Sequence, residues 1–392
     1  MNRRQFLTRS VLGTALGQGL IACNASSSSA STVLFLKNSI PPQLIHAFQS
    51  QVAQGKDLNF KPEAQLKKLF EFLKDWQLKN PEPQGLLSHL PFIGNTPKAI
   101  AALTTTGDSW LQDAIVKGLI QPLNLQAVPS WQKLDPRWHQ LVTRDRQGFL
   151  AEKGDIWGAP YRWGTTLIVY RRAKFQDWGW TPQDWSDLWR PELKQQIALL
   201  DQPREVIGLT LKKLGYSYNI PDLEKVPDLK SSLQALQKQV KFYSNDYYLQ
   251  ALQAKDVAVA VGWSNEILPL LVNNPDLAAV IPASGTAIWA DLWVRPKNAP
   301  SHSAIISDWL DFCWQPQSAN QIALFSDGSS PRLETLEAEA ILPTVRNNPL
   351  LTLTPHLWRS CEFLEPLSVQ TQQQYLKLWQ AIRTTTTEKS MT

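Results

Sequence analysis

The sequence predicts an α/β protein built from two lobes, and two observations support this prediction. Short apolar runs rich in β-branched residues alternate with segments of helical periodicity, as at Thr165–Tyr170, Ile197–Leu200 and Val257–Val261. Such alternation is typical of a largely parallel sheet with helices on its faces. The chain has 392 residues. A single hydrophobic core stops growing at roughly 250–300 residues, so two lobes are expected.

The expected elements follow from the spacing of apolar residues. Residues 43–54 and 63–77 carry apolar side chains at helical spacing. Residues 287–296 alternate aliphatic side chains with Trp289, Asp291 and Trp293, which predicts a two-faced strand that Pro296 ends. The other expected strands are 33–36, 165–170, 197–200, 257–261 and 279–282, and the other expected helices are 207–214, 233–240, 302–314, 318–325 and 369–382.

The N-terminus has the features of a bacterial export signal. Arg3 and Arg4 precede Gln-Phe-Leu and a short uncharged apolar run, a pattern typical of a twin-arginine signal peptide over residues 1–22. Leu20-Ile21-Ala22-Cys23 resembles a lipobox, so we expect Cys23 to be lipidated, and residues 23–31 form a Ser-rich tether. The sequence thus predicts a periplasmic protein held at the membrane by a lipid anchor.

Charge and motifs exclude several classes of function. Loss of the three leader arginines lowers the formal charge from +5 to +2, so we expect no nucleic-acid partner. The sequence lacks a CxxC pair, a GxSxG or HExxH motif and a Walker phosphate loop. Cys313 and Cys361 are expected to be buried thiols. We therefore predict no metal, no cofactor and no enzymatic activity.

Two acidic positions suggest a site for an organic cation. Asp291 lies between Trp289 and Trp293 on one face of the expected strand, and a carboxylate between aromatic faces suits an ammonium ion. The alternative is a half-buried strand whose Asp291 caps or salt-bridges a local group. Asp108 follows Thr104–Gly107 at a helix start, where α/β sheets bind ligands, although it can also serve simply as the N-cap. Seventeen tryptophans fit a stacking site as well as a core.

Four segments resemble the spermidine/putrescine-binding proteins of bacterial ABC importers. They are Trp185–Pro191, Asp201–Asn219, Asp256–Leu268 and Ile281–Pro300. The resemblance implies a type II periplasmic binding protein with two α/β lobes, two crossover strands as a hinge and a ligand cleft between the lobes. The expected lobes are 32–170 with 292–335, and 171–291 with 336–392. The implied partners are a polyamine or related small cation and an ABC permease in the inner membrane, with the protein itself a monomer.

The same resemblance implies particular site residues. Glu205, Trp263, Trp289 and Asp291 match cleft residues of the family: the two carboxylates would each take a ligand nitrogen, and the two indoles would sandwich the methylene chain. Other positions depart from the family pattern. Gln202 stands where an acidic residue is usual, Ser109 stands where an aromatic is usual, and Ser326–Ser329 lacks a late tyrosine. We expect Gln202, Asp108, Ser109 and Trp110 to contact the ligand as well.

Two other functions fit parts of the sequence. Asp246-Tyr247-Tyr248 resembles the paired phenolates of iron-binding relatives, which would make the ligand ferric iron, unless these tyrosines simply pack at a helix start. Asp291 and Glu205 could also form the carboxylate pair of a surface glycan-active enzyme.

Overall fold

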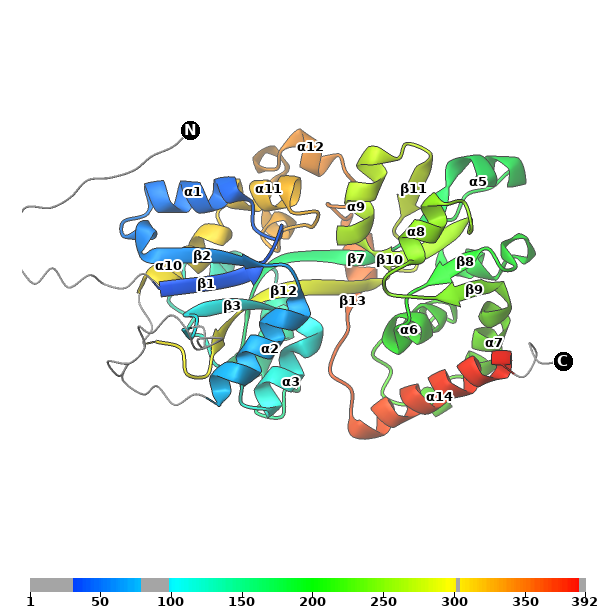
Figure 1. The fold of residues 1–392 in the computed structure, drawn as a ribbon, viewed down its shortest axis with the longest axis horizontal. Helices are drawn as coiled ribbons and strands as arrows, with labels where there is room; N and C mark the ends of the chain where they lie inside the picture. Colours follow the sequence, from blue (N-terminus) through cyan, green and yellow to red (C-terminus); the bar gives the residue numbers. More distant parts are fainter. Residues whose placement is uncertain (1–30, 79–98, 301–303, 388–392) are drawn as a thin grey trace, which may run out of the picture.

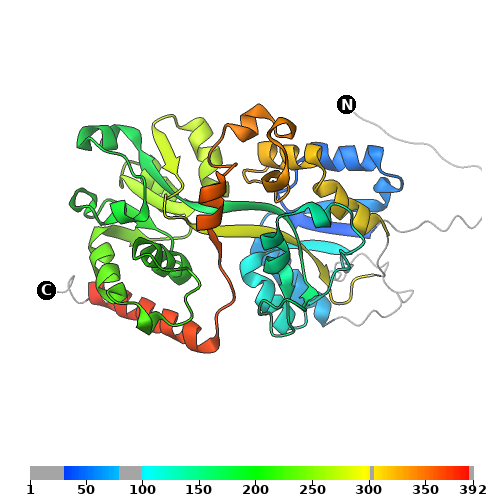
Figure 2. The same cartoon turned by 180° about the vertical axis from the view of Figure 1, so that it is seen from behind.

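The computed structural model describes residues 31–78, 99–300 and 304–387. The expected signal peptide (residues 1–22) and Cys23 lie outside the described residues, as does all of the expected tether except Ser31. Two groups of helices and strands lie at the two ends of a pair of long strands, β7 (Ala159–Arg171) and β12 (Ala287–Pro296), which run between them (Figure 1). Figure 2 shows the same two strands joining the lobes from behind. The predicted two-lobe α/β fold is confirmed.

The strands of both lobes join in one sheet through β7 and β12, in the order β2-β1-β3-β12-β7-β10-β8-β9. β1 pairs in parallel with β2 and β3, and β8 pairs in parallel with β9 and β10. β7 and β12 pair antiparallel with each other and with β10 and β3, respectively. The expectation of a largely parallel sheet is therefore wrong at its centre, because the chain crosses between the lobes in opposite directions on these two strands.

The first lobe carries the N-terminal strands and the helices that cover them. α2 illustrates why they form: its apolar residues Leu69, Phe70, Leu73 and Trp76 recur at helical spacing and are buried in the core. The strands are β1 (Ser31–Leu36), β2 (Leu58–Glu63), β3 (Leu103–Gly107), β4 (Ile120–Gln121), β5 (Thr143–Arg144), β6 (Asp155–Ile156) and β13 (Glu362–Phe363). The helices are α1 (Pro42–Gln51), α2 (Leu66–Gln77), α3 (Leu111–Val116), α4 (Pro136–Val142), α10 (Ala304–Cys313), α11 (Pro316–Phe325), α12 (Pro343–Arg346) and α13 (Pro355–Ser360).

The second lobe is built around short buried strands. β10 (Val259–Trp263) is buried except at its last residue, as its continuous run of small and β-branched residues predicts. The other strands are β8 (Ile197–Leu199), β9 (Val240–Tyr243) and β11 (Leu277–Val280), and the helices are α5 (Arg172–Trp178), α6 (Pro203–Lys213), α7 (Leu229–Gln239), α8 (Tyr248–Gln253), α9 (Ser264–Asn273) and α14 (Val369–Thr387). Single 3-10 turns in the chain are η1 (Gly55–Asp57), η2 (Asp108–Trp110), η3 (Trp131–Lys133), η4 (Trp185–Trp189), η5 (Pro191–Leu193), η6 (Leu223–Lys225), η7 (Leu333–Thr335) and η8 (Ala338–Ala340).

The C-terminal region divides between the lobes. Trp358 packs against Trp138 of α4 and Trp163 of β7, with ring centroids 5.8 and 5.2 Å apart, and Val345 packs with the apolar residues of α11. α14 instead packs against α6 and α7 of the second lobe. The expected boundary gives all of residues 336–392 to the second lobe, but Val345 and Trp358 pack on the first, and β13 contacts both lobes, because Phe363 packs on Trp138 and Glu362 pairs with Lys212 of α6 at 2.9 Å.

Most of the tryptophans belong to the core. Trp76, Trp138, Trp163, Trp185, Trp293, Trp309 and Trp314 are fully buried. The thiols of Cys313 and Cys361 are also buried and free, as predicted. Over residues 31–78, 99–300 and 304–387, no helix combines the length and apolarity that crossing a membrane requires.

Candidate ligand-binding site

The crossover strands bring the predicted site residues onto one face. Antiparallel pairing places Asp291 opposite Arg162 and Trp289 opposite Gly164, while β10 places Trp263 opposite Thr166. Because side chains alternate along a strand, positions 162, 164 and 166 of β7 share a face, and directly paired residues lie beside them. The face therefore carries a row of charged and aromatic side chains between the lobes.

The carboxylate of Asp291 is already paired within the protein. Oδ2 of Asp291 accepts hydrogen bonds from Nε of Arg162 at 2.8 Å and lies 2.6 Å from Nη2. Both residues are only 4% exposed. The guanidinium also donates from Nη1 to the carbonyl of Ser326 at 2.6 Å, and its Cζ lies 5.4 Å from the centroid of the Trp289 ring. The interpretation of Asp291 as a partner in a local salt bridge is confirmed.

Trp293 does not take part in this face. Its indole is fully buried in the first lobe, where it stacks on Tyr161 at 4.7 Å and meets Trp309 of α10 edge-on. The pairing of β7 with β12 shifts register between Asp291 and Leu292, so that Tyr161 is passed over. The expected indole–carboxylate–indole row is therefore wrong at its third member.

Glu205 is the buried carboxylate of the second lobe. It lies in the first turn of α6, after the N-cap Gln202 and Pro203, where the helix dipole favours a negative charge. The hydroxyl of Thr166 donates to its two oxygens at 3.1 and 3.0 Å, and the indole N–H of Trp263 donates to Oε1 at 3.0 Å. Burial raises the pKa of Glu205, and these hydrogen bonds oppose the rise. Among the described residues, its hydrogen-bond donors are thus a hydroxyl and an indole N–H, both neutral.

Asp108 approaches the same face from the first lobe. It begins η2 directly after β3, and its Oδ1 accepts the backbone N–H of Ala290, between Trp289 and Asp291, at 3.2 Å. Burial raises its pKa from the ordinary 3.8 to about 7, against hydrogen bonds from the backbone and the charge of Arg144. The N-cap residue of η2 is Gly107 rather than Asp108, and the carboxylate of Asp108 accepts backbone hydrogen bonds both from Ser109 in its own turn and from Ala290 of β12.

The indoles of Trp263 and Trp289 are half-buried, and the position of the Trp289 ring depends on a glycine. A Cβ built on Gly164 would lie 2.4 Å from Cζ2 of Trp289 and 2.1 Å from Oγ of Ser264. Only glycine therefore lets the Trp289 ring lie this close to β7. The indole N–H of Trp289 is buried and has no acceptor among the described residues.

Three other residues that were expected to contact the ligand are Trp110, Ser109 and Gln202, and each has different surroundings. The Trp110 ring packs on Phe70 of α2, with centroids 5.0 Å apart, so it supports the first lobe's core. Ser109 is exposed. Gln202 is the N-cap of α6, one turn before Glu205. Sequence reasoning missed Arg162 and Thr166; the signal for Arg162 was a charged residue inside an otherwise apolar strand, which requires a buried counter-ion.

The tyrosines of the iron hypothesis do not converge. Tyr247 is 68% exposed, whereas Tyr248 is buried and its hydroxyl donates to Glu266. In the described part of the chain, no group of three or more His, Cys, Asp or Glu side chains could hold a metal ion. The packing interpretation of Tyr248 fits these contacts.

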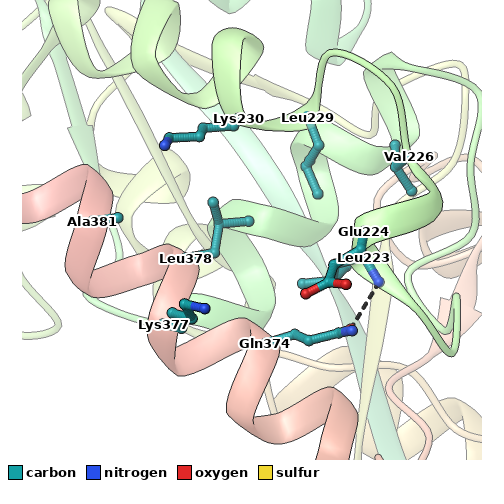
Figure 3. A pocket seen from close by; sticks show the side chains of 9 residues that line it. All are labelled: Leu223, Glu224, Val226, Leu229, Lys230, Gln374, Lys377, Leu378 and Ala381. Carbon is teal, nitrogen blue, oxygen red and sulfur yellow. Dashed lines mark hydrogen bonds between the residues drawn. The ribbon is translucent and has the colours of Figure 1, made fainter.

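Two measurable cavities lie away from this face. The first cavity, of about 310 Å³, lies between η6, α7 and α14. Its lining residues are Leu223, Glu224, Val226, Leu229, Lys230, Gln374, Lys377, Leu378 and Ala381 (Figure 3). Another of about 370 Å³ lies between α1 and the start of α11. Neither contains a predicted site residue, and the face described above remains the candidate because its buried carboxylates and indoles meet there.

Two α/β lobes joined by crossover strands that carry buried acceptors and indoles have the architecture of a two-lobe solute-binding protein. The family model of the bacterial extracellular solute-binding proteins matches residues 100–355. The chain belongs to this family.

Relatives and solved structures agree with that assignment. A spermidine/putrescine-binding periplasmic protein of Salmonella typhimurium is 25% identical over 232 residues, 59% of this chain and 63% of that protein's length. A putrescine/agmatine-binding protein of Pseudomonas aeruginosa is 24% identical over 70% of this chain and 76% of the relative. A spermidine/putrescine ABC transporter substrate-binding protein of Streptococcus pneumoniae has a TM-score of 0.73 at 20% identity, covering 90% of this chain and 98% of that one. The type II periplasmic binding fold is thereby confirmed.

Proposed function

We propose that this chain captures a small organic cation of the polyamine type and delivers it to an ABC permease in the inner membrane. The observation that carries the proposal is Glu205, a carboxylate 6% exposed whose hydrogen-bond donors among the described residues are a hydroxyl and an indole N–H. The charge of Arg204 acts on it, but a buried carboxylate that accepts no hydrogen bond from a cation favours a ligand that brings one. The names of the relatives, which include spermidine, putrescine and agmatine, point to the same chemistry.

The half-buried indoles of Trp263 and Trp289 suit the rest of such a ligand. An alkyl chain next to an ammonium favours apolar walls, and the faces of indole rings attract the cation itself. The two rings come from β10 and β12, which lie on either side of β7. In the proposed cycle, bending at the crossover strands closes the lobes on the ligand, and the permease recognises the closed form.

The remaining parts of the proposal concern location. Arg3 and Arg4 would direct export through the twin-arginine route, and Cys23 would carry a lipid that holds a monomeric protein on the periplasmic side of the membrane. Family membership supports a place outside the cytoplasm.

The test is isothermal titration of the purified protein with putrescine, spermidine and spermine, with tryptophan fluorescence read in parallel. We expect micromolar or tighter binding with a change in fluorescence. Glu205→Gln should weaken binding about 10- to 100-fold, because a charge-assisted hydrogen bond contributes about 1.5–3 kcal/mol. Glu192→Gln, at an exposed position of η5, is the matched control. Unchanged affinity in the Glu205 variant would contradict the proposed site.

A further inference from the structure

We propose that Arg162 is a specificity-determining residue that leaves the site with one position for an ammonium group, so that a polyamine gains no affinity from its second ammonium. The inference rests on the proposed function and refines it. A site for a dication needs two separate buried acceptors that are open to the ligand. In this chain one of the candidate acceptors, Asp291, is held by an internal guanidinium, so the protein supplies the second cation itself.

The contacts show that Arg162 is fixed in this role. Its guanidinium uses Nε and Nη2 on one oxygen of Asp291 and Nη1 on the carbonyl of Ser326. Gly328 lies against its stem: a Cβ there would lie 2.9 Å from Cγ of Arg162. With 4% of the residue exposed, the side chain is packed on all of these sides and cannot be moved aside at low cost to admit a ligand ammonium.

The groups around Arg162 also disfavour a second ammonium. The guanidinium lies 5.4 Å from the centre of the Trp289 ring, whose buried N–H has no acceptor among the described residues. Both groups are hydrogen-bond donors, and one is positively charged. These donors suit a hydrogen-bond acceptor, uncharged or anionic, at the far end of the ligand. Another carboxylate near the guanidinium, Asp327, is half-buried; burial raises its pKa, and the charge of Arg162 opposes the rise.

Asp108, Glu205 and Asp291 are the buried carboxylates of the described residues, and of these Glu205 is the one left for a ligand cation. Glu205 is bound by neutral donors, and the neighbouring Arg204 directs its guanidinium to Tyr218, Asn219, Tyr375 and the carbonyl of Glu365. Asp108 is engaged by the N–H of Ala290 and lies in the field of Arg144. The ligand ammonium is therefore assigned to Glu205, with Trp263 beside it.

The experiment compares ligands of one chain length on the wild-type protein: putrescine with two ammonium groups, n-butylamine with one, and 4-aminobutanoate with one ammonium and one carboxylate. Isothermal titration at pH 7.5 gives the three affinities. We expect a one-ammonium compound to bind at least as tightly as putrescine. Tighter binding of 4-aminobutanoate than of butylamine identifies an anionic far end, and the reverse order identifies an uncharged one; either supports the proposal.

Variants then test the role of the ion pair. In Arg162→Leu the carboxylate of Asp291 loses its cation, and the affinity for putrescine relative to butylamine should rise at least tenfold. In the double variant Arg162→Leu with Asp291→Asn the charge is again balanced, so this gain should disappear. Thermal melting of each variant verifies folding, and the wild-type comparison stands independently if Arg162→Leu does not fold.

Different results would count against the role of Arg162 and against the proposed capture of a cation. Putrescine binding tighter than both one-ammonium compounds in the wild type overturns the role of Arg162 and leaves cation capture in place. An unchanged preference in folded Arg162→Leu overturns it as well. If none of these compounds and no longer polyamine binds, the proposed function fails and the inference fails with it.

Discussion

Asp108 should make the stability of this protein depend on pH, and Asp108→Asn should remove that dependence. Burial raises the pKa of the folded protein's Asp108 from 3.8 to about 7. The folded state therefore holds a proton that the unfolded chain has released between these two pH values, and stability falls as pH rises through this window. The stabilising proton contributes fully below pH 3.8, and its contribution is lost above about 7.

The magnitude follows from the difference between the two pKa values. It corresponds to about 4 kcal/mol of stability lost between pH 4 and pH 8 through this residue, since each pKa unit corresponds to about 1.4 kcal/mol. Asparagine keeps an oxygen that can accept the N–H of Ala290 but cannot ionise. Asp108→Asn should therefore match the wild type only below about pH 4, exceed its stability by about 1.5 kcal/mol at pH 5, and exceed it by about 4 kcal/mol at pH 8.

The assay is urea denaturation of both proteins at pH 4, 5.5 and 8. The difference between the two proteins isolates Asp108 from other carboxyl groups, such as Glu334, whose pKa burial raises to about 8. Parallel loss of stability in the wild type and the variant would refute the assignment, because it would show that Asp108 does not titrate between the folded and unfolded states.

Two further predictions concern packing and the anchor. Gly164→Ala should weaken ligand binding and lower the free energy of unfolding by about 1–3 kcal/mol, because its Cβ would lie 2.4 Å from Trp289 and force that indole away. Calorimetric unfolding and ligand titration would measure these two effects. A variant with normal affinity would contradict the placement of the ring. Cys23→Ser should release the protein from membranes into the soluble periplasmic fraction. Cell fractionation would measure this release, and mass spectrometry of the wild-type N-terminus would detect the lipid. A wild-type protein without an attached lipid would contradict the anchor.

Periodicity and a few polar residues were enough to predict much of the fold. The alternation over 287–296 predicts a strand, and β12 has these bounds. Runs such as Val257–Val261 and Thr165–Tyr170 predict buried strands because apolar β-branched side chains favour a sheet that is covered on both faces. The long chain predicts two lobes for a reason of scale alone. Local sequence is sufficient to predict these strands because each prediction depends only on neighbouring residues within one element.

The same local signals could not decide how the strands pair. The antiparallel crossing of β7 and β12, and the packing of Val345 and Trp358 on the first lobe, depend on contacts between segments far apart in the chain. Trp289 and Trp293 occupy equivalent positions in the alternation of β12, but α10 and Tyr161 bury the second, while Gly164 leaves room for the first beside the candidate site.

The amino-acid sequence shows two carboxylates where a cation can be bound, Asp291 within an apolar strand and Glu205 at the start of a helix. The folded structure is needed to see that the two differ. Asp291 is neutralised by Arg162, a residue 129 positions away that strand pairing brings opposite it, whereas Glu205 meets neutral donors. The physical reason is that the charge available to a ligand depends on which side chains are buried next to it, and the register of β7 on β12 sets that neighbour.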